Sequence, residues 1–596
     1  MSFTDALRVI ADLECQWDVN AVRYDGVAVW PIIRNALTAS LENPHNPTFR
    51  QSRNGQYNLW SYLPDSAQLK SLEAYGGVDF LFWTRWNEYR RQIHGRYYGL
   101  SDSYLEMVKD SHRVLKIELD SGLIKTTSPR FYPMEIIRYQ QSRIPCPVGR
   151  DDIQNFQALR QRVLSLCSID MDEGVILEIL HNTEQYHLFF LDVLQRIGPR
   201  IVSLICYYTC PIAMGLIRAC RDLGIPTVEL QHGIVPQSPY YERWTRIPEG
   251  GYEYLPDYFY VWGDLFRDAI AAFRPAGCRH HLPVVGSHED LRKALQEPGT
   301  PREGLDPGFL SELKRPGKKI LVTLEYPADG IPSHLVDAMR TSPRDWLWLL
   351  RCHPRFRDQK QPFIDLLSRN GIDHYEIERA TDQPLFALLK SVHAHLTSFS
   401  SVCIEALRVG VPSLLYSPVG YEYFKEYVQK GFLGYEPDSA ENLLRWINTP
   451  KDPAVIRQQG ERFFAMEPGL GRRVFETLLK ESIPRQPQIR LRGYRAANLN
   501  RLGQDHVRHG NLPAAIEIFS SAIRCEPQDP EAYNNLGGLC WHMGHYDQAR
   551  RFIETAMQID PSNERTVQNW RRLRKAQPAG TRTSMALEAG IGCPKS

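Results

Sequence analysis

The amino-acid sequence predicts an α/β fold of two units, followed by an all-α repeat domain. Short apolar runs with strand character alternate with helical patterns through the first 480 residues. A stretch rich in proline, glycine and charge interrupts this alternation at 289–318, after which it starts again. After about residue 490 the strand-like runs end and a repeat with a 34-residue offset begins. A chain of 596 residues has room for three or four domains, so we interpret these changes as domain boundaries.

The first unit, 1–288, contains six predicted strands separated by helical patterns. Most of these strands are apolar at nearly every position, which is typical of parallel strands buried on both faces. Between them, 153–166 repeats its apolar residues at helical spacing. The predicted strands are VDFLFW (78–83), HRVLKIEL (112–119), RIVSLICYY (200–208), PTVEL (226–230), DYFYVW (257–262) and LPVVG (282–286).

The most apolar long run, 201–220, is interpreted as a strand, a turn and a helix. Pro211 interrupts it and Arg218 lies near its end, which disfavours a membrane span. The N-terminus is acidic and amphipathic and lacks the features of a secretory signal. A net charge of +2 gives no electrostatic basis for a nucleic-acid or membrane partner. Twelve cysteines without a CxxC pattern fit a reducing compartment, so a cytoplasmic location is expected.

The second unit, 305–480, repeats the α/β pattern after the linker. Two such units joined by a hinge-like segment suggest a pair of Rossmann-like domains. Ligands of these domains bind at the carboxyl ends of the strands, and we expect them in the cleft between the units. The predicted strands are KILVTLE (319–325), WLWLLR (346–351), VHAHLTS (392–398) and PSLLYS (412–417).

The C-terminal region, 490–577, resembles the tetratricopeptide repeat, a helix–turn–helix unit with small residues where its helices cross. Two repeats cannot bury their faces alone, so a third helix, 564–577, is expected to cap them. Such arrays bind proteins, which predicts a protein partner. The tail, 578–596, is predicted to be disordered. The matched positions are Leu502 with Leu536, Gly503 with Gly537, Gly510 with Gly544, Ala515 with Ala549, Ala522 with Ala556 and Pro527 with Pro561.

A cluster of serines follows the predicted strand at 392–398, in the sequence TSFSSVCIEAL. Ser400 and Ser401 stand where a helix would begin, and a hydroxyl at this position commonly caps the helix. The same position presents free N–H groups and the positive end of the helix dipole to an anion. Helix capping and a phosphate site are both compatible with the serines alone.

Two histidines follow other predicted strands. His353 comes after 346–351, is flanked by Arg351 and Arg355, and is expected one strand away from the serines. This combination suits a phosphate. His232, in the sequence QHG, follows 226–230, and Gly233 allows a tight turn that would expose its imidazole. An imidazole titrates in the range that general base catalysis needs, although a structural loop histidine is the alternative.

The order of QHG, VWG (261–263), VVG (284–286), HP and TSxSSxxxEA resembles bacterial glycosyltransferases of the two-domain GT-B type. The resemblance is to those that make surface polysaccharides, including capsule, Kdo and sialic acid transferases and teichoic acid polymerases, and YDGVAVWPIIR (24–34) is similar to surface-carbohydrate proteins. It implies that His353, Ser400 and Ser401 hold the donor phosphates and that Glu405 holds the donor ribose. For Glu405, a helix-surface carboxylate is the alternative. The resemblance implies no metal cofactor, because the helix dipole, imidazole and hydroxyls meet the phosphate charge.

The identity of the catalytic base stays open between two segments. Sialyltransferases of this type have an acidic D/E-D/E-G motif, and this chain has MDEG at 171–174, with Glu173 as the candidate base. We favour His232, because it follows a predicted strand whereas MDEG follows a helical pattern. The acidic residues at 170–172 could also suggest a metal-binding DxD, but no strand is predicted before them.

The sequence is compatible with three functions. The favoured one is an inverting, metal-independent glycosyltransferase that uses a nucleotide-sugar donor, such as a CMP-activated acidic sugar, and a surface-glycan or flagellin-like protein acceptor. A polyol-phosphate transferase that uses CDP-glycerol would have the same landmarks. A scaffold with an inactive GT-B body and a partner-binding repeat domain belongs to another class.

Overall fold

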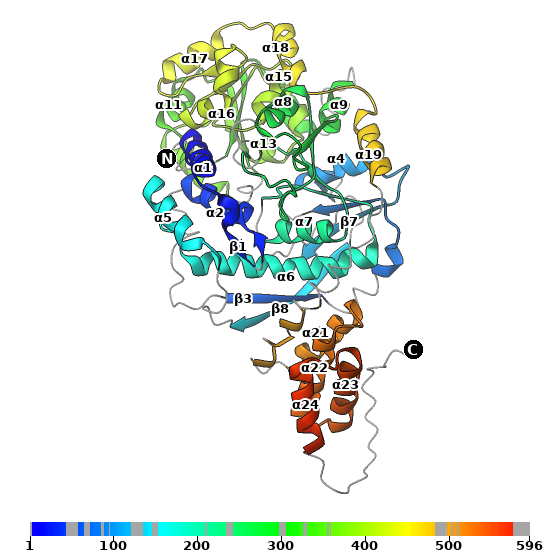
Figure 1. Ribbon diagram of the computed structural model, residues 1–596. Coiled ribbons are helices and arrows are strands. Elements are labelled where there is room, and N and C mark those ends of the chain that lie inside the picture. The colour runs from blue at the N-terminus through cyan, green and yellow to red at the C-terminus, as the bar shows by residue number, and fades with distance from the viewer. Residues whose placement is uncertain are drawn as a thin grey trace. The chain divides into compact units, whose positions relative to one another are not determined.

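The computed structural model divides the chain into two compact units, Met1–Gln486 and Pro487–Ser596. Figure 1 shows the first as layers of helices around two sheets and the second as a group of helices. The structure describes residues 3–24, 26–42, 58–64, 72–84, 89–93, 96–120, 135–145, 153–208, 211–233, 241, 244–296, 305–325, 330–353, 357, 359–482 and, with interruptions, 496–575. The tail at 578–596 lies outside these residues.

The first sheet has eight strands in the order β12-β11-β10-β9-β4-β7-β8-β3. All neighbours are parallel except β8 and β3, which are antiparallel. The six predicted strands are confirmed. The strands β4, β9 and β10 are buried throughout, as expected for parallel strands, whereas the edge strand β12 is partly buried. In order across the sheet, the strands are Leu282–Val285, Tyr258–Val261, Thr227–Leu230, Ile201–Leu204, Phe80–Thr84, Val114–Asp120, Glu135–Pro145 and Asn58–Pro64.

Helices surround this sheet, the longest being α6 (Glu173–Ile197), which crosses the view in Figure 1. The run at 201–220 is β9, a turn and α7, with Pro211 at the N-cap of α7, as predicted. Among the described helices, none has the length and apolar character to cross a membrane. Two small hairpins pair β1 (Arg23–Tyr24) with β2 (Val27–Ala28) and β5 (Tyr89–Ile93) with β6 (Arg96–Gly99). The other helices are α1 (Phe3–Gln16), α2 (Trp30–Glu42), α4 (Leu100–Val108), α5 (Phe156–Cys167), α7 (Ile212–Asp222), α8 (Asp264–Phe273) and α9 (Glu289–Gln296).

The second sheet has six parallel strands in the order β15-β14-β13-β16-β17-β18. The four predicted strands correspond to β13 (Lys319–Leu324), β14 (Leu347–Cys352), β16 (Ala394–Thr397) and β17 (Ser413–Leu415). The two-residue strands β15 (Tyr375–Glu376) and β18 (Gly434–Tyr435) form the edges. Its helices are α10 (Pro307–Leu313), α11 (Ser333–Thr341), α12 (Gln361–Arg369), α13 (Glu378–Asp382), α14 (Leu385–Leu389), α15 (Val402–Arg408), α16 (Pro418–Gln429), α17 (Ala440–Asn448) and α18 (Pro453–Gly460).

The chain returns to the first sheet at α19 (Leu470–Glu481). Phe475 of this helix is buried against Phe80, and its ring stacks on Tyr260 with centroids 5.3 Å apart. A Cβ added to Gly263 would lie 2.4 Å from the carbonyl oxygen of Phe463, so the returning chain passes close to the turn after β11. The core of the first sheet therefore includes residues that follow the second sheet in the sequence.

The second compact unit contains α21 (Leu512–Cys525), α22 (Pro530–His542), α23 (Tyr546–Ile559) and α24 (Glu564–Lys575). The alanines matched by the repeat, at 515, 522, 549 and 556, are fully buried. A Cβ at Gly503 would lie 2.4 Å from the Phe519 ring, and one at Gly537 would lie 2.6 Å from Ile553. Small residues therefore occupy the helix crossings, as the repeat predicts.

Candidate active site

Two predicted ligand-binding segments and one carboxylate that was not predicted lie at one edge of the second sheet. His353 follows β14, Glu325 follows β13, and the serine turn, 398–401, follows β16. β13 pairs with both β14 and β16, so one strand lies between the strand that His353 follows and the strand that the serines follow. The backbone N–H of His353 donates to the carbonyl of Leu324 at 2.9 Å, which ties the end of β14 to the end of β13. His353 itself is exposed.

The hydroxyls of the serine turn differ in their hydrogen bonds and in their exposure. The Oγ of Ser400 accepts from the N–H of Val402 at 3.4 Å, so Ser400 serves as a helix cap. Ser401 is the N-cap residue of α15 by position, but its side chain makes no capping bond. Ser398 is buried, and its Oγ lies 2.6 Å from the Oγ of Ser417, the N-cap of α16. The starts of α15 and α16 are therefore linked through two serines, and Ser400 and Ser401 remain partly exposed.

Glu325 accepts hydrogen bonds from Thr397 and from the serine turn, and it was not identified from the sequence. Its carboxylate accepts from Thr397 Oγ1 at 2.7 Å and from the N–H of Ser398 at 3.3 Å. Burial raises the pKa of Glu325 to about 7, against the lowering effect of these hydrogen bonds. The sequence feature that could have identified Glu325 is its position directly after an apolar strand. His353 was identified from the same kind of position.

Two other candidates at this edge differ from the sequence expectations. Glu405 is 2% exposed on α15, so it is not a helix-surface carboxylate. The guanidinium of Arg351 donates to the carbonyls of Ala380 at 2.9 Å and Gln383 at 2.6 Å, which gives it a structural role. Arg355 lies outside the described residues.

His232 follows β10, at the carboxyl edge of the first sheet. Its Nδ1 lies 3.4 Å from the carbonyl oxygen of Leu230, and its Nε2 lies 3.1 Å from Cys206 Sγ and 3.3 Å from the Tyr208 hydroxyl. A carbonyl can only accept, so in the neutral ring Nδ1 carries the proton and Nε2 is the acceptor. His232 is thus held in the tautomer that can take a proton at Nε2.

Glu229, on β10, supports His232 and was also missed from the sequence. This carboxylate is fully buried and accepts the N–H groups of Cys206 at 2.8 Å and Tyr207 at 3.0 Å. Its Oε1 lies 3.7 Å from His232 Nδ1. The pKa of Glu229 is raised well above its ordinary value by burial, and the opposing effect of the nearby His232 is smaller.

The MDEG segment forms the start of α6. Asp172 is the N-cap of this helix and accepts from the N–H of Gly174 at 2.8 Å. Glu173 accepts from the side-chain amide of Gln157 at 2.7 Å. Asp170 is paired with Arg160 at 2.6 Å on the surface. These contacts give the acidic residues local structural roles, and no group of three metal-ligating side chains gathers within the described ranges.

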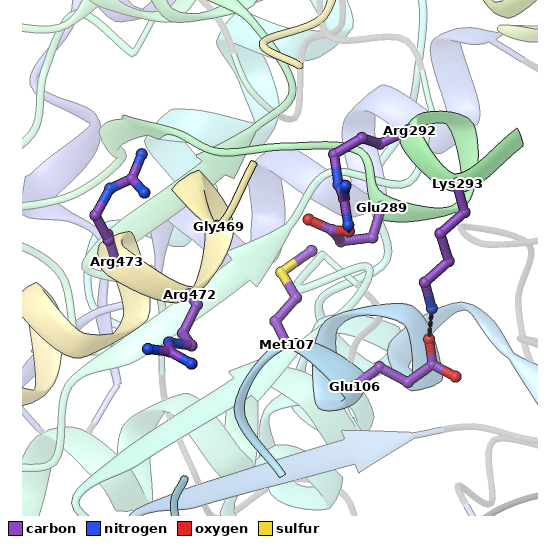
Figure 2. A pocket seen from close by; sticks show the side chains of 8 residues that line it. All are labelled: Glu106, Met107, Glu289, Arg292, Lys293, Gly469, Arg472 and Arg473. Atoms are coloured by element: carbon purple, nitrogen blue, oxygen red, sulfur yellow. Dashed lines mark hydrogen bonds and ion pairs between the residues drawn. The ribbon is translucent and has the colours of Figure 1, made fainter. Parts of the chain in front are cut away.

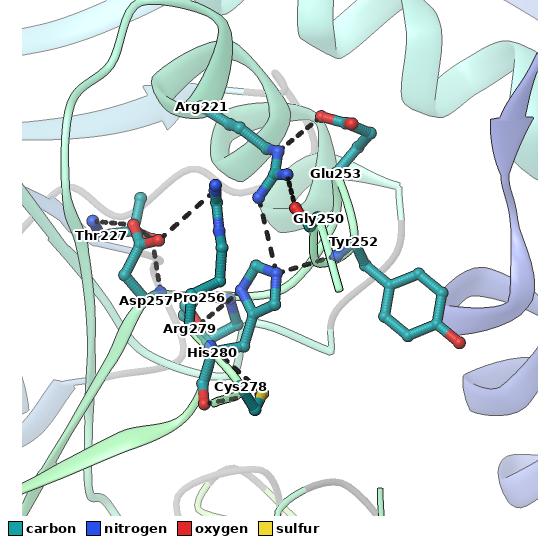
Figure 3. A network of polar contacts seen from close by, with 10 residues as sticks. All are labelled: Arg221, Thr227, Gly250, Tyr252, Glu253, Pro256, Asp257, Cys278, Arg279 and His280. Atoms are coloured by element: carbon teal, nitrogen blue, oxygen red, sulfur yellow. Dashed lines mark hydrogen bonds and ion pairs between the residues drawn. The ribbon is translucent and has the colours of Figure 1, made fainter. Parts of the chain in front are cut away.

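His280 illustrates a buried histidine without access to a ligand (Figure 3). Its Nε2 accepts from the N–H of Tyr252 at 2.8 Å, and its Nδ1 lies 3.2 Å from the carbonyl of Pro256. Burial, with Arg279 and Arg221 nearby, lowers the pKa of His280 to about 3. His280 therefore stays neutral and acts as a structural link between two loops.

A pocket of about 370 Å³ is lined by residues of α4, α9 and the start of α19 (Figure 2). Its cationic side chains are each paired with a carboxylate. Lys293 contacts Glu106, Arg292 contacts Glu289 at 2.6 Å, and Arg472 and Arg473 contact Glu476 and Glu467. Two of these carboxylates, Glu467 and Glu476, lie outside the pocket lining. The lining residues are Glu106, Met107, Glu289, Arg292, Lys293, Gly469, Arg472 and Arg473.

Comparison with known proteins identifies the repeat region. The tetratricopeptide repeat family model matches residues 506–569. The photosystem I assembly protein Ycf3 of Sorghum bicolor is 26% identical over 91 residues, which are 13% of this chain. The chain spans about half of that relative, 53% of its length.

Solved structures are similar to about two thirds of this chain. The UDP-GlcNAc 2-epimerase of Neisseria meningitidis, bound to UDP-GlcNAc, is 14% identical with a TM-score of 0.41, covering 68% of this chain and 99% of that one. The wall teichoic acid polymerase TagF is 12% identical with a TM-score of 0.38, covering 69% and 90%. The glycosyltransferase of kitacinnamycin is 15% identical with a TM-score of 0.38, covering 68% and 99%. The assignment of two Rossmann-like domains followed by a helical repeat region rests on the strand orders given above and on the repeat match.

Proposed function

We propose that this chain is a cytoplasmic, inverting, metal-independent glycosyltransferase that uses a nucleotide-sugar donor. The observation that carries the proposal is the geometry of His232. Its Nδ1 faces a backbone carbonyl at 3.4 Å, which makes Nε2 the proton acceptor of the ring, at the carboxyl end of a parallel strand and beside Cys206 and Tyr208. This is the arrangement that a general base needs when the reacting group is a sugar hydroxyl.

The proposed reaction is a direct displacement. His232 Nε2 takes the proton of the acceptor hydroxyl, and the oxygen of that hydroxyl attacks the anomeric carbon of the donor sugar. The bond from that carbon to the donor phosphate breaks, and the nucleotide leaves with the electron pair. His353, Ser400 and Ser401 would hold the leaving phosphate, which gains negative charge as the bond breaks. Glu405 would hold the donor ribose from α15, the helix that begins at Ser401.

The identities of the donor and the acceptor are also proposed. A CMP-activated acidic sugar is one candidate donor, and a surface glycan or a flagellin-like protein is the candidate acceptor. The repeat unit would recruit a protein, because tetratricopeptide arrays present a concave surface to their partners.

A donor panel tests the proposal. The full-length chain is incubated with CMP-, CDP-, UDP- and GDP-sugars and with CDP-glycerol, and the released nucleotide is measured. Release from one sugar nucleotide, reduced in a His353→Ala variant, supports glycosyl transfer. Release from CDP-glycerol alone would instead indicate a polyol-phosphate transferase. Absence of both nucleotide binding by calorimetry and release would indicate a scaffold.

A further inference from the structure

A thiol, an imidazole and a carboxylate lie in sequence at the carboxyl edge of the first sheet. Cys206 Sγ lies 3.1 Å from His232 Nε2, and His232 Nδ1 lies 3.7 Å from Glu229 Oε1. A nucleophile beside a base that a third group orients is the arrangement that activates thiols in enzymes. We propose that Cys206 is a nucleophilic thiol whose proton His232 accepts, and that it is a site of covalent modification by carbon electrophiles.

The backbone holds this thiol in place. Cys206 directly follows β9 and Ile205, in the connection to α7, and has a φ of 62°, which few non-glycine residues adopt. The buried Glu229 carboxylate fixes this conformation by accepting the N–H groups of Cys206 and Tyr207. The same carboxylate lies 3.7 Å from His232 Nδ1, whose hydrogen-bond partner is the Leu230 carbonyl. Glu229 therefore positions the thiol, and the backbone of β10 orients the base.

Strand pairing explains why these residues meet. β9 and β10 are parallel neighbours, with Leu204 opposite Glu229, so the turns after both strands lie at the same edge. Glu229 on β10 and the hydroxyl of Tyr208, 3.3 Å from Nε2, are among the polar groups next to Cys206 and His232. The Tyr241 ring lies 6.5 Å from that of His232. The thiol is partly buried, which leaves a route for a small reagent.

The modification is a simple substitution. The proton of Cys206 passes to His232 Nε2, and the thiolate attacks the carbon of iodoacetamide that bears iodine. The sulfur–carbon bond forms, the carbon–iodine bond breaks, and iodide leaves. A group attached to Cys206 would then stand between His232 Nε2 and an acceptor hydroxyl. This last consequence rests on the proposed function, whereas the reactivity of the thiol does not.

The test compares cysteines within one folded protein. The full-length chain is treated with limiting iodoacetamide near neutral pH, and labelling of each cysteine is followed by peptide mass spectrometry. Cys15, which is exposed, and Cys167, which is partly buried like Cys206, are the internal references. Because an ordinary thiol is only a few per cent thiolate at pH 7, we expect Cys206 to be labelled about tenfold faster than Cys15. Labelling of Cys206 no faster than that of Cys167 would overturn the proposal.

Variants separate activation from exposure. His232→Gln should slow the labelling of Cys206 at least fivefold and leave Cys15 unchanged, with circular dichroism confirming the fold. An unchanged rate at Cys206 in a folded His232→Gln protein would also contradict the proposal. If a donor has been found, iodoacetamide should abolish nucleotide release by the wild-type protein to the same extent as it labels Cys206. The reagent should not change the rate of nucleotide release by the Cys206→Ser variant. Rapid labelling without activity on any donor would leave the thiol assignment standing and reject the glycosyltransferase.

Discussion

Glu325 offers a prediction whose size follows from its surroundings. Its carboxylate is partly buried and has a pKa of about 7 against an ordinary value of 4.5, because burial disfavours the charged form. The folded protein therefore binds this proton more tightly than the unfolded chain does. The stability that this proton contributes is fully present below about pH 4.5 and is lost as the pH rises through about 7. A difference of about 2.5 pKa units corresponds to about 3 kcal/mol of unfolding free energy.

Glu325→Gln removes this titration while keeping a similar shape. The amide oxygen can still accept from Thr397 or Ser398. We expect the loss of stability between pH 5 and pH 8 to be smaller in Glu325→Gln than in the wild type, by up to about 3 kcal/mol. Urea unfolding of the full chain, followed by tryptophan fluorescence at both pH values, measures this difference. The matched control is Glu441→Gln, which changes an exposed carboxylate on α17 and should leave the pH dependence unchanged. An equal pH dependence in Glu325→Gln and the wild type would refute the reasoning.

Three further predictions concern the donor site, metals and the repeat unit. His353→Ala, and separately the double change of Ser400 and Ser401 to alanine, should each weaken nucleotide binding by about 1.5–3 kcal/mol in calorimetry without unfolding the chain; unchanged affinity in both would remove the phosphate site. Nucleotide release should survive excess EDTA, and loss that manganese or magnesium restores would count against a metal-independent reaction. A chain ending at residue 486 should still hydrolyse donor slowly but fail to glycosylate its cellular target, whereas full activity on that target would reject recruitment by the repeats.

The fold was predictable where a sequence signal does not depend on strand order. Mostly apolar runs identified ten strands, because parallel strands covered on both faces bury most of their side chains. The strands β3 and β8 were missed because NLWSYLP and EIIRYQQSRIP mix polar and apolar residues. The repeat was predictable because its small residues recur with a fixed offset, and the structure shows why they must be small at Gly503 and Gly537.

The site was predictable only in part, because its geometry depends on which strands become neighbours. The sequence identified His232 and His353 as residues that follow strands, and the structure places both at carboxyl edges. It gave no indication that β13 separates His353 from the serines, or that β9 brings Cys206 to His232. Glu229 and Glu325 carry no periodicity that marks a buried carboxylate, so their roles appear only with the hydrogen bonds they accept.

The most direct test of the account compares His232→Gln with the matched variant Glu173→Gln. Turnover of the identified donor and acceptor is measured together with donor affinity by calorimetry. Because a general base contributes on the order of a hundred- to ten-thousand-fold, His232→Gln should lose turnover by at least that lower factor and keep donor affinity within about twofold. Glu173→Gln, which alters only a surface contact with Gln157, should turn over normally. Near-normal turnover in His232→Gln, with loss in Glu173→Gln, would contradict the central claim and move the base to the start of α6.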